Sequence, residues 1–497
     1  MRLSFKQQFG RDRRGNVVMM YALALPLLLF GAGAAIDYVH AAQVRTRLNA
    51  AADAAVLAAL TPGMMQQSNA TAQTAAQNMF NGLAAGISSL VSGDTTVTVT
   101  ITNPNGNALV RNVSVSYTAQ NQNIFAGVLG VPSIEVGGAA QASASVAANI
   151  DFYLLLDNSP SMALPATQAG ITQMENLTAQ QDGGVGCAFA CHQASTGNGD
   201  TQGNSCAKTS NGKTTYTAPT LTTSGRTSGN AYCATTQGTQ IDDYQMARNN
   251  GITLRIDALN TGVSDLMSDA ATAAQTAAST PPVYRFAAYS MDSSWQVDMT
   301  SSNNYNKLMA LTTNYVSSWS SASSNLTLME YYSNNVPCGN SGCTSSGSGG
   351  DWATDYDNAL TTMNTLMPNP GQGTNVKGDT PQEVLFFVTD GVEDESTSAC
   401  SQAMTGSRCQ APINPSLCTT IKNRGIRIAI LYTDYYQVTA DAWYEEWIAP
   451  FQSSIASSLE SCASPGLYYD AGVDSTNLGG DLQALFNTVV QTAHLTQ

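Results

Sequence analysis

The sequence predicts an α/β protein whose main domain is built on a doubly wound, mostly parallel sheet. Apolar runs such as "FYLLL" (152–156) lack polar alternation, which is typical of strands that are buried on both faces. Stretches with helical periodicity lie between these runs, and alternating strands and helices indicate a parallel sheet. A charge-free run near the N-terminus predicts a transmembrane helix ahead of this domain.

These patterns divide the chain of 497 residues into four consecutive parts. They are a cytoplasmic N-terminus at 1–16, a transmembrane helix at 17–36, a helix with a small β region at 37–148, and the α/β domain at 149–497. We expect a large insertion that contains cysteines, at about 163–245, within the last part.

The transmembrane prediction rests on the run "VVMMYALALPLLLFGAGAAI" at 17–36. As a helix this run spans about 30 Å, the thickness of a hydrocarbon core. Basic residues precede it, and the positive-inside rule then keeps the N-terminus in the cytoplasm and exports the rest. A cleaved signal peptide is the alternative, but the run exceeds the usual apolar region of about 7–15 residues. The helical pattern also continues to about residue 60, so we expect one uncleaved helix.

Composition and cysteine placement agree with export. The net charge of −15 argues against nucleic acid and suits a protein that attracts cations, and three histidines leave little room for histidine-based catalysis or zinc. All ten cysteines lie between Cys187 and Cys462, which predicts disulfides in an oxidising compartment. Short spacings favour local Cys338–Cys343 and Cys400–Cys409 bridges, although spacing alone does not fix the pairing.

A small sheet is expected after the long helix. Alternating apolar residues flank an Asn105-Gly106 turn in "TVTVTITNPNGNALVRNVSVSYTA", which is a strong hairpin signal. A further strand is expected in "SIEVGGAAQASASV" (133–146). A long N-terminal helix that leads into a small sheet is a pilin-like layout.

The N-terminal segment "RRGNVVMMYALALPLLLFGAGAAIDYVHAAQVRTRLNAAADAAVLAA" resembles the TadE/TadG-like proteins of the bacterial tight-adherence (Flp) pilus machinery. The resemblance covers roughly residues 10–60 and implies a single-pass protein of the bacterial inner membrane. Its C-terminal domain would be periplasmic or extracellular. Processed pseudopilins usually carry Glu five residues after the cleavage glycine, whereas Met20 stands there if Gly15 is that glycine. A permanent anchor is therefore favoured.

The α/β domain contains strands and helices in alternation. Strands are expected at 152–156, 283–290, 295–299, 383–388 and 426–432, and helices at 252–275, 356–367 and 478–490. Ligands bind such sheets outside the carboxyl ends of the strands. That rule directs attention to the residues that follow each strand.

Oxygen-bearing side chains follow two of these strands. Asp157, Ser159 and Ser161 come directly after "FYLLL", and Asp390 ends the strand in "LFFVTDG". Two carboxylates and two hydroxyls form a hard-oxygen set that suits Mg²⁺, Mn²⁺ or Ca²⁺. The structural alternative, without a metal ion, is a polar turn that caps the next helix.

This D-x-S-x-S motif with a distant T-D-G resembles the metal-ion-dependent adhesion site (MIDAS) of the von Willebrand factor A (vWA) family, whose fold is Rossmann-like. The family also uses a threonine, and Thr354 in "TDYDNAL" fits, while Thr374 and Thr380 are alternatives. The resemblance therefore assigns a metal site, with Mg²⁺ or else Mn²⁺ or Ca²⁺. It also implies a protein partner whose carboxylate completes the coordination. The assigned residues are Asp157, Ser159, Ser161, Thr354 and Asp390.

A second motif, "CAFACH" (187–192), lies in the insertion. Haem attachment normally uses C-x-x-C-H, whereas this motif has three residues between the cysteines. We therefore expect a disulfide there and no haem.

Three functions are weighed. The first is a membrane-anchored, non-enzymatic adhesion or assembly protein of a Tad/Flp-type pilus that binds a partner through the metal. The second is a structural scaffold or minor pilus component whose metal site is non-functional. The third, a metal-dependent hydrolase, lacks a general base, a nucleophile elbow or a phosphate loop in the sequence.

Overall fold

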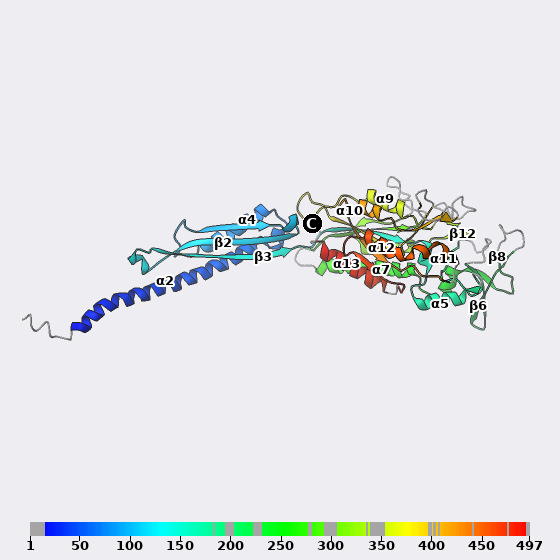
Figure 1. Ribbon diagram of the computed structural model, residues 1–497, viewed down its shortest axis with the longest axis horizontal. Coiled ribbons are helices and arrows are strands. Elements are labelled where there is room, and N and C mark those ends of the chain that lie inside the picture. Colours follow the sequence, from blue (N-terminus) through cyan, green and yellow to red (C-terminus); the bar gives the residue numbers. More distant parts are fainter. Residues whose placement is uncertain are drawn as a thin grey trace, which may run out of the picture. The chain divides into compact units, whose positions relative to one another are not determined.

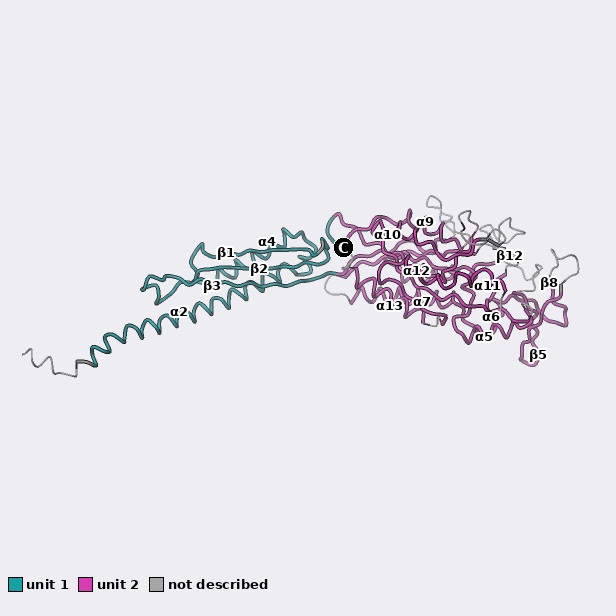
Figure 2. The backbone as a smooth tube through the Cα atoms, viewed as in Figure 1, with its two compact units in different colours: residues 1–146, 375–377, 497 teal, residues 147–374, 378–496 magenta. Residues whose placement is uncertain are grey.

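A computed structural model (Figure 1) describes residues 15–181, 184–193, 203–221, 231–276, 281–292, 306–333, 336–337, 353–395, 400, 404–405, 408–439, 442–474 and 477–493. The chain forms two compact units (Figure 2). The N-terminal unit contains the residues up to Val146 and the segment Asn375–Lys377, and the C-terminal unit contains Ala147–Thr374 and the residues from Gly378 onward.

One helix, α2 (Gly15–Ala59), forms the first part of the N-terminal unit. Its first half is apolar and exposed, with Leu27 73% and Leu28 69% accessible. Its second half buries one face, which includes Val44 and Leu48, because apolar residues recur there every three to four positions. The predicted continuous helix is confirmed, and by length and composition it can cross a membrane.

The second half of α2 and helix α4 (Asn69–Ala84) pack on an antiparallel three-stranded sheet in the order β1-β2-β3. The strands are β1 (Thr96–Thr102), β2 (Val110–Gln122) and β3 (Ser133–Ser145), so the predicted hairpin and third strand are confirmed. The turn is wider than two residues, because a 3-10 turn, η1 (Pro104–Gly106), lies between β1 and β2.

A six-stranded sheet forms the centre of the C-terminal unit, in the order β11-β10-β4-β14-β18-β19. Neighbouring strands are parallel except for the edge strand β11, which is antiparallel to β10. The strands are β4 (Ile150–Asp157), β10 (Tyr284–Met291), β11 (Lys307–Thr312), β14 (Gln382–Thr389), β18 (Arg427–Tyr432) and β19 (Tyr468–Asp470).

Helices pack on both faces of this sheet. Tyr153 and Leu155 of β4 share a core with α9 (Tyr356–Leu366), α10 (Pro415–Lys422) and α12 (Ala449–Cys462). On the other face, Phe152 contacts Phe486 of α13 (Leu478–Thr492), which packs beside α7 (Arg255–Thr276). The α/β class is confirmed, and parallel pairing is confined to this central sheet, because the smaller sheets of the described residues are antiparallel.

The insertion contains helix α5 (Gln168–Leu177) and a small sheet of β5 (Asn204–Ser210), β6 (Lys213–Thr217) and β9 (Thr239–Asp242). Cys206–Cys233, Cys400–Cys409 and Cys418–Cys462 are disulfides, the second of which was predicted. The predicted Cys338–Cys343 bridge and the predicted strand at 295–299 lie outside the described residues.

The remaining elements are short. They are α3 (Pro62–Met65), η2 (Ala126–Leu129), η3 (Pro160–Ala163), β7 (Thr220–Leu221), β8 (Ala231–Tyr232), α6 (Asp243–Asn249), α8 (Tyr315–Ala322), η5 (Ser323–Asn325), β12 (Tyr331–Ser333), β13 (Val336–Pro337), β15 (Val392–Glu395), β16 (Met404–Thr405), β17 (Arg408–Pro412) and α11 (Ala442–Trp447).

Candidate functional site

The carboxyl ends of β4 and β14 place Asp157 and Asp390 at one edge of the sheet. The two strands are parallel neighbours, with Leu156 opposite Val388, so the residues that follow them lie side by side. Both strands consist of buried residues, and both aspartates are buried as well. The sheet therefore brings two carboxyl groups together away from solvent.

The loop after β4 brings Ser159 and Ser161 to the same place. The backbone N–H of Ser159 donates to Oδ1 of Asp157 at 2.9 Å, which folds the loop back over the strand end. The hydroxyl oxygens of Ser159 and Ser161 are then 2.9 Å apart. The Ser161 hydroxyl also approaches Asp390, and it opposes the rise that burial causes in the pKa of that carboxyl group. The structure therefore brings four of the five predicted residues together.

Asp390 is fully buried and poorly satisfied. Neither of its carboxylate oxygens accepts a hydrogen bond of ordinary geometry, although the Ser161 hydroxyl and the backbone N–H of Val392 approach it. Gly391, the next residue, has φ +85° and no room for a side chain, since a Cβ there would clash with a methyl carbon of Ile455. A buried carboxylate without full hydrogen bonding is costly unless a cation pairs with it.

The electrostatics of the pair follow from burial. Burial, followed by the charge of Asp390, raises the pKa of Asp157 to about 7. Burial also raises the pKa of Asp390, against the opposing effects of Ser161 and Arg255. Two buried carboxylates in proximity disfavour each other's ionisation. A divalent cation between them would relieve both costs, and the donor set of carboxylates and hydroxyls fits such a cation.

Thr354 lies next to this site through its backbone. It is buried, and it forms an isolated bridge with Asp394 of β15, with N–H to O distances of 3.1 and 3.0 Å. Within the described residues, no hydrogen bond joins the Thr354 hydroxyl to the other four predicted residues. The structure thus places Thr354 on the segment beside β15 without showing its side chain in the cluster.

The alternatives Thr374 and Thr380 lie at the wrong end of the sheet. Both precede β14, which begins at Gln382, whereas Asp390 follows the end of that strand. Thr374 instead donates its hydroxyl to Asp379 at 2.5 Å. The length of β14 puts these threonines roughly 25 Å from Asp390, so neither can share an ion with it.

Sequence reasoning missed three residues at this edge. Thr389 donates its hydroxyl to Oδ2 of Asp157 at 2.7 Å, and its oxygen lies 2.5 Å from the Tyr356 hydroxyl. Arg255 is buried, and its charge acts on Asp390. Asp292 follows β10 and accepts from the Asn158 amide at 3.0 Å. Thr389 could have been found because it directly precedes Asp390, and Asp292 because it directly follows a strand. Arg255 gave no such signal, since in the sequence it resembles an ordinary residue on a helix surface.

A second acidic cluster lies on the segments that flank this site. Asp355, Glu393 and Glu395 offer carboxylate oxygens that all lie within 4.8 Å of one another. Burial and the neighbouring carboxylates raise the pKa of Glu393 to about 8 and that of Glu395 to about 9. Asp355 also caps α9 by accepting from the N–H of Asn358 at 2.9 Å. The three neighbouring carboxyl groups therefore disfavour each other's ionisation.

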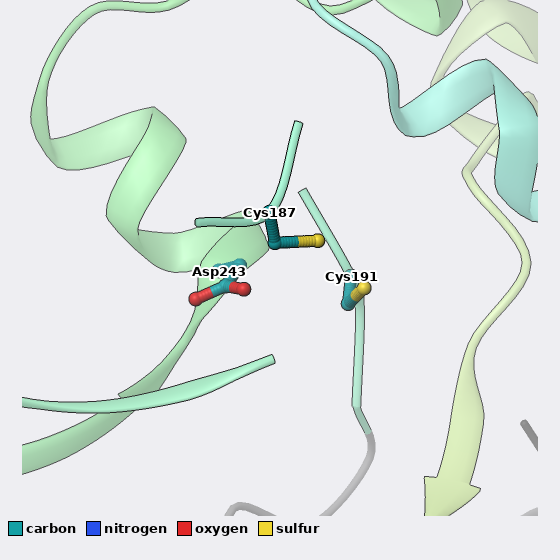
Figure 3. Close-up of side chains that lie close together, drawn as sticks. All are labelled: Cys187, Cys191 and Asp243. Carbon is teal, nitrogen blue, oxygen red and sulfur yellow. The ribbon is translucent and has the colours of Figure 1, made fainter. Parts of the chain in front are cut away.

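The "CAFACH" motif forms a cluster of a different chemistry. Cys187 and Cys191 are thiols in the structure, so the predicted disulfide is not formed. Their sulfur atoms and a carboxylate oxygen of Asp243 all lie within 4.8 Å of one another (Figure 3). His192 instead lies 3.0 Å from Asp242. The loop is tied to the candidate metal site, because Ala190 donates to the carbonyl of Ala163, two residues after Ser161.

Aromatic residues are crowded in the segment after β18. They are Tyr435, Tyr436, Trp443, Tyr444 and Trp447, and such residues can either anchor a partner or pack on the core. Tyr444 is buried in the core that α12 helps to form, and Tyr435 and Trp443 pack against the same core. The structure therefore favours packing for these three.

Comparison with known proteins gives a family match for the N-terminal segment and weak similarity to solved structures. Residues 15–78 match the Flp pilus-assembly TadE/G-like family. Among solved structures, the chain is similar to a point mutant of the PilB minor pilin from Streptococcus sanguinis, with a TM-score of 0.33 and 9% identity over 82% of this chain and 81% of that one. It is also similar to the vWF domain of the type V pili tip protein Mfa5 from Porphyromonas gingivalis, with a TM-score of 0.30 and 10% identity over 71% and 97%.

No curated protein matches the chain. The family match confirms the predicted resemblance of the N-terminal segment to TadE/TadG-like proteins. Residues 15–78 are thus similar to Tad pilus-assembly proteins, and the apolar helix in this segment can serve as a membrane anchor by its length and composition. Similarity at these TM-scores transfers no site or ligand.

Proposed function

We propose that this chain is a membrane-anchored, non-enzymatic adhesion or assembly protein of a Tad/Flp-type pilus. In this proposal it resides in the bacterial inner membrane, and α2 holds it there with the N-terminus in the cytoplasm. Its C-terminal unit binds Mg²⁺, or else Mn²⁺ or Ca²⁺, through Asp157, Ser159, Ser161 and Asp390. Thr354 would join the set by turning its hydroxyl toward the ion.

The observation that carries the proposal is the buried pair of Asp157 and Asp390 beside two serine hydroxyls. Both oxygens of Asp390 lack hydrogen bonds of ordinary geometry, so a cation has ligands ready to receive it. Asp157, by contrast, accepts a hydrogen bond at each carboxylate oxygen, one from the Ser159 N–H and one from the Thr389 hydroxyl. These two bonds fix the orientation of its side chain. One oriented and one unsatisfied carboxylate favour a cation over a simple structural hydrogen bond.

A bound ion would attract an acidic partner. Protein groups supply only part of the coordination of such an ion, and a carboxylate from another protein would complete it. The partner we propose is a component of the pilus machinery or of the cell surface that offers an Asp or Glu side chain. The role of the residues is to hold the ion and to present it, and no bond of the partner is broken.

Arg255 favours a second candidate function. Its buried guanidinium lies near enough to Asp390 to oppose the rise that burial causes in the pKa of that carboxyl group, so a fixed cation already supplies part of the missing charge. In that case the site would be structural, and the chain would act as a scaffold or minor pilus component without a functional metal site.

Capture of pilus proteins by the full chain in detergent distinguishes the metal-dependent binding function from the scaffold. We expect capture in Mg²⁺, loss in EDTA, and recovery when Mg²⁺ is restored. Asp157→Asn and Asp390→Asn should abolish capture, whereas Asp265→Asn, at an exposed aspartate on α7 of the same unit, should retain it. Capture that survives both EDTA and the two site substitutions would support the scaffold and contradict the metal-dependent function.

A further inference from the structure

The connection between β2 and β3 exposes an unusual amount of apolar surface. Its sequence, "NIFAGVLGVP" (123–132), contains no charged residue. Val128 is 82% exposed and Ile124 is 60% exposed. Phe125, Leu129 and Val131 are also among the exposed apolar side chains of the protein. Apolar residues clustered in this way mark a contact surface rather than a solvated loop.

Contacts with helix α2 fix the position of this connection along the helix axis. The buried carboxylate of Asp37 accepts hydrogen bonds from the backbone N–H groups of Ile124, Phe125 and Ala126, at 2.8, 3.1 and 2.7 Å. The side chain of Phe125 lies against Gly33, where an added Cβ would come within 2.7 Å of the Phe125 Cβ. The connection is therefore fixed against the helix at residues 33–37.

Residues 33–37 of α2 coincide with the end of the predicted membrane span. The charge-free run ends at Ile36, and Asp37 is the first acidic residue after it. Tyr38 follows and is 71% exposed, and tyrosines are enriched where a membrane meets water. A span that ends at residue 36 places the exposed side chains of the connection at the boundary between lipid headgroups and acyl chains.

The backbone of the connection suits that environment. Polar backbone groups cannot be left unpaired near the hydrocarbon region. Asp37 takes three N–H groups, and internal turns take others: Val128 donates to Phe125, Gly130 to Gly127 and Val131 to Ala126. The connection thus presents apolar side chains outward while most of its backbone donors are paired.

We infer that residues 123–132 form a second membrane contact, which dips into the lipid interface beside the anchor helix. The occupant of this surface is the bilayer itself, by continuity with the exposed apolar half of α2. Asp37 acts as the positioning residue, because it fixes the connection at the level where the span ends. The inference rests on the anchor role of α2 in the proposed function and is independent of the metal site.

Photo-crosslinking of the full chain in liposomes of phosphatidylethanolamine and phosphatidylglycerol tests this contact. A benzophenone amino acid replaces Leu129, or Leu27 within the span, or Leu57, which is 62% exposed on the same helix. Leu57 is twenty residues beyond Asp37, roughly 30 Å along the axis, and serves as the water-facing control. We expect lipid adducts at Leu129 in a yield close to that at Leu27 and several-fold above that at Leu57.

The outcomes separate the inference from the anchor. A yield at Leu129 as low as that at Leu57, with Leu27 labelled, would overturn the second contact and leave the anchor intact. Loss of labelling at Leu27 as well would remove the anchor itself. Adducts between Leu129 and a second copy or another protein would overturn the lipid contact in favour of a protein interface. In Asp37→Asn we expect reduced labelling at Leu129 and unchanged labelling at Leu27, and equal labelling at Leu129 would contradict the role of Asp37.

Discussion

Two buried charged groups of the N-terminal unit, Arg111 and Asp37, differ from Asp390 of the C-terminal unit in their hydrogen bonding. In the N-terminal unit, Arg111 is buried, and its guanidinium donates to the carbonyls of Ala59, Met64 and Gln67. Asp37 accepts from three backbone N–H groups in the same unit. In the C-terminal unit, neither carboxylate oxygen of Asp390 accepts a hydrogen bond of ordinary geometry, although the Ser161 hydroxyl and the Val392 N–H approach it. Satisfied charges hold a fold together, whereas an unsatisfied one is available to a ligand.

The largest expected effect on stability concerns Arg111, whose hydrogen bonds are satisfied. Arg111→Met removes the donors to the carbonyl groups of Ala59, Met64 and Gln67 and should destabilise the N-terminal unit by about 3 kcal/mol. Arg47→Met, at an exposed position on α2, is the matched control and should have little effect. Hydrogen–deuterium exchange of peptides from each unit measures the change, which should be the same with and without Mg²⁺. A loss that Mg²⁺ restores would contradict the assignment of Arg111 as purely structural.

The next effect concerns Mg²⁺ and pH in the C-terminal unit. At ten times a Kd on the order of 10⁻³ M, Mg²⁺ should stabilise that unit by about 1.4 kcal/mol at pH 8. The folded, metal-free protein retains a proton on Asp157 up to a pKa of about 7, above the value in an unfolded chain. Metal-free stability should therefore fall as pH rises from roughly 4 to 7.

Mg²⁺ competes with that proton, so the stabilisation by Mg²⁺ should grow as pH rises through the Asp157 pKa of about 7. Thermal unfolding at several pH values, with and without Mg²⁺, measures both trends. Asp157→Asn should remove the Mg²⁺ effect and flatten the metal-free profile. A Mg²⁺ effect that does not depend on pH would place the ion elsewhere.

The smallest effects are expected from two matched substitutions that change the stability of their units in opposite directions. Asp390→Asn removes an unsatisfied buried charge and, without metal at pH 8, should stabilise the C-terminal unit by about 1 kcal/mol. Asp37→Asn weakens three charge-assisted hydrogen bonds and should destabilise the N-terminal unit. Denaturant unfolding with exchange readouts from each unit gives both signs. Destabilisation in both variants would remove the distinction between Asp37 and Asp390.

The parts of the fold with strong local patterns could be predicted from the sequence. The runs that form β4, β14 and β18 are continuously apolar because both faces of the sheet are covered, and α2 is marked by length and periodicity. The proximity of Asp157 and Asp390 could be predicted because residues that follow neighbouring parallel strands meet at one edge of the sheet.

The contributions that depend on packing could not be predicted. Arg255 is buried against the site by tertiary contacts that leave no trace in its own segment. Thr389 bonds to Asp157 across 232 positions of sequence. The thiols of Cys187 and Cys191 face Asp243 because of the fold of the insertion, which its Ser- and Gly-rich sequence does not specify.

Calorimetric titration of the full chain with Mg²⁺ tests the central claim most directly. The account predicts binding with a Kd on the order of 10⁻⁴ to 10⁻³ M, and one ion fewer in the Asp157→Asn, Asp390→Asn double variant. Asp265→Asn should bind as the unaltered protein does. Equal numbers of bound ions in the double variant and the unaltered protein would contradict a metal site at the ends of β4 and β14.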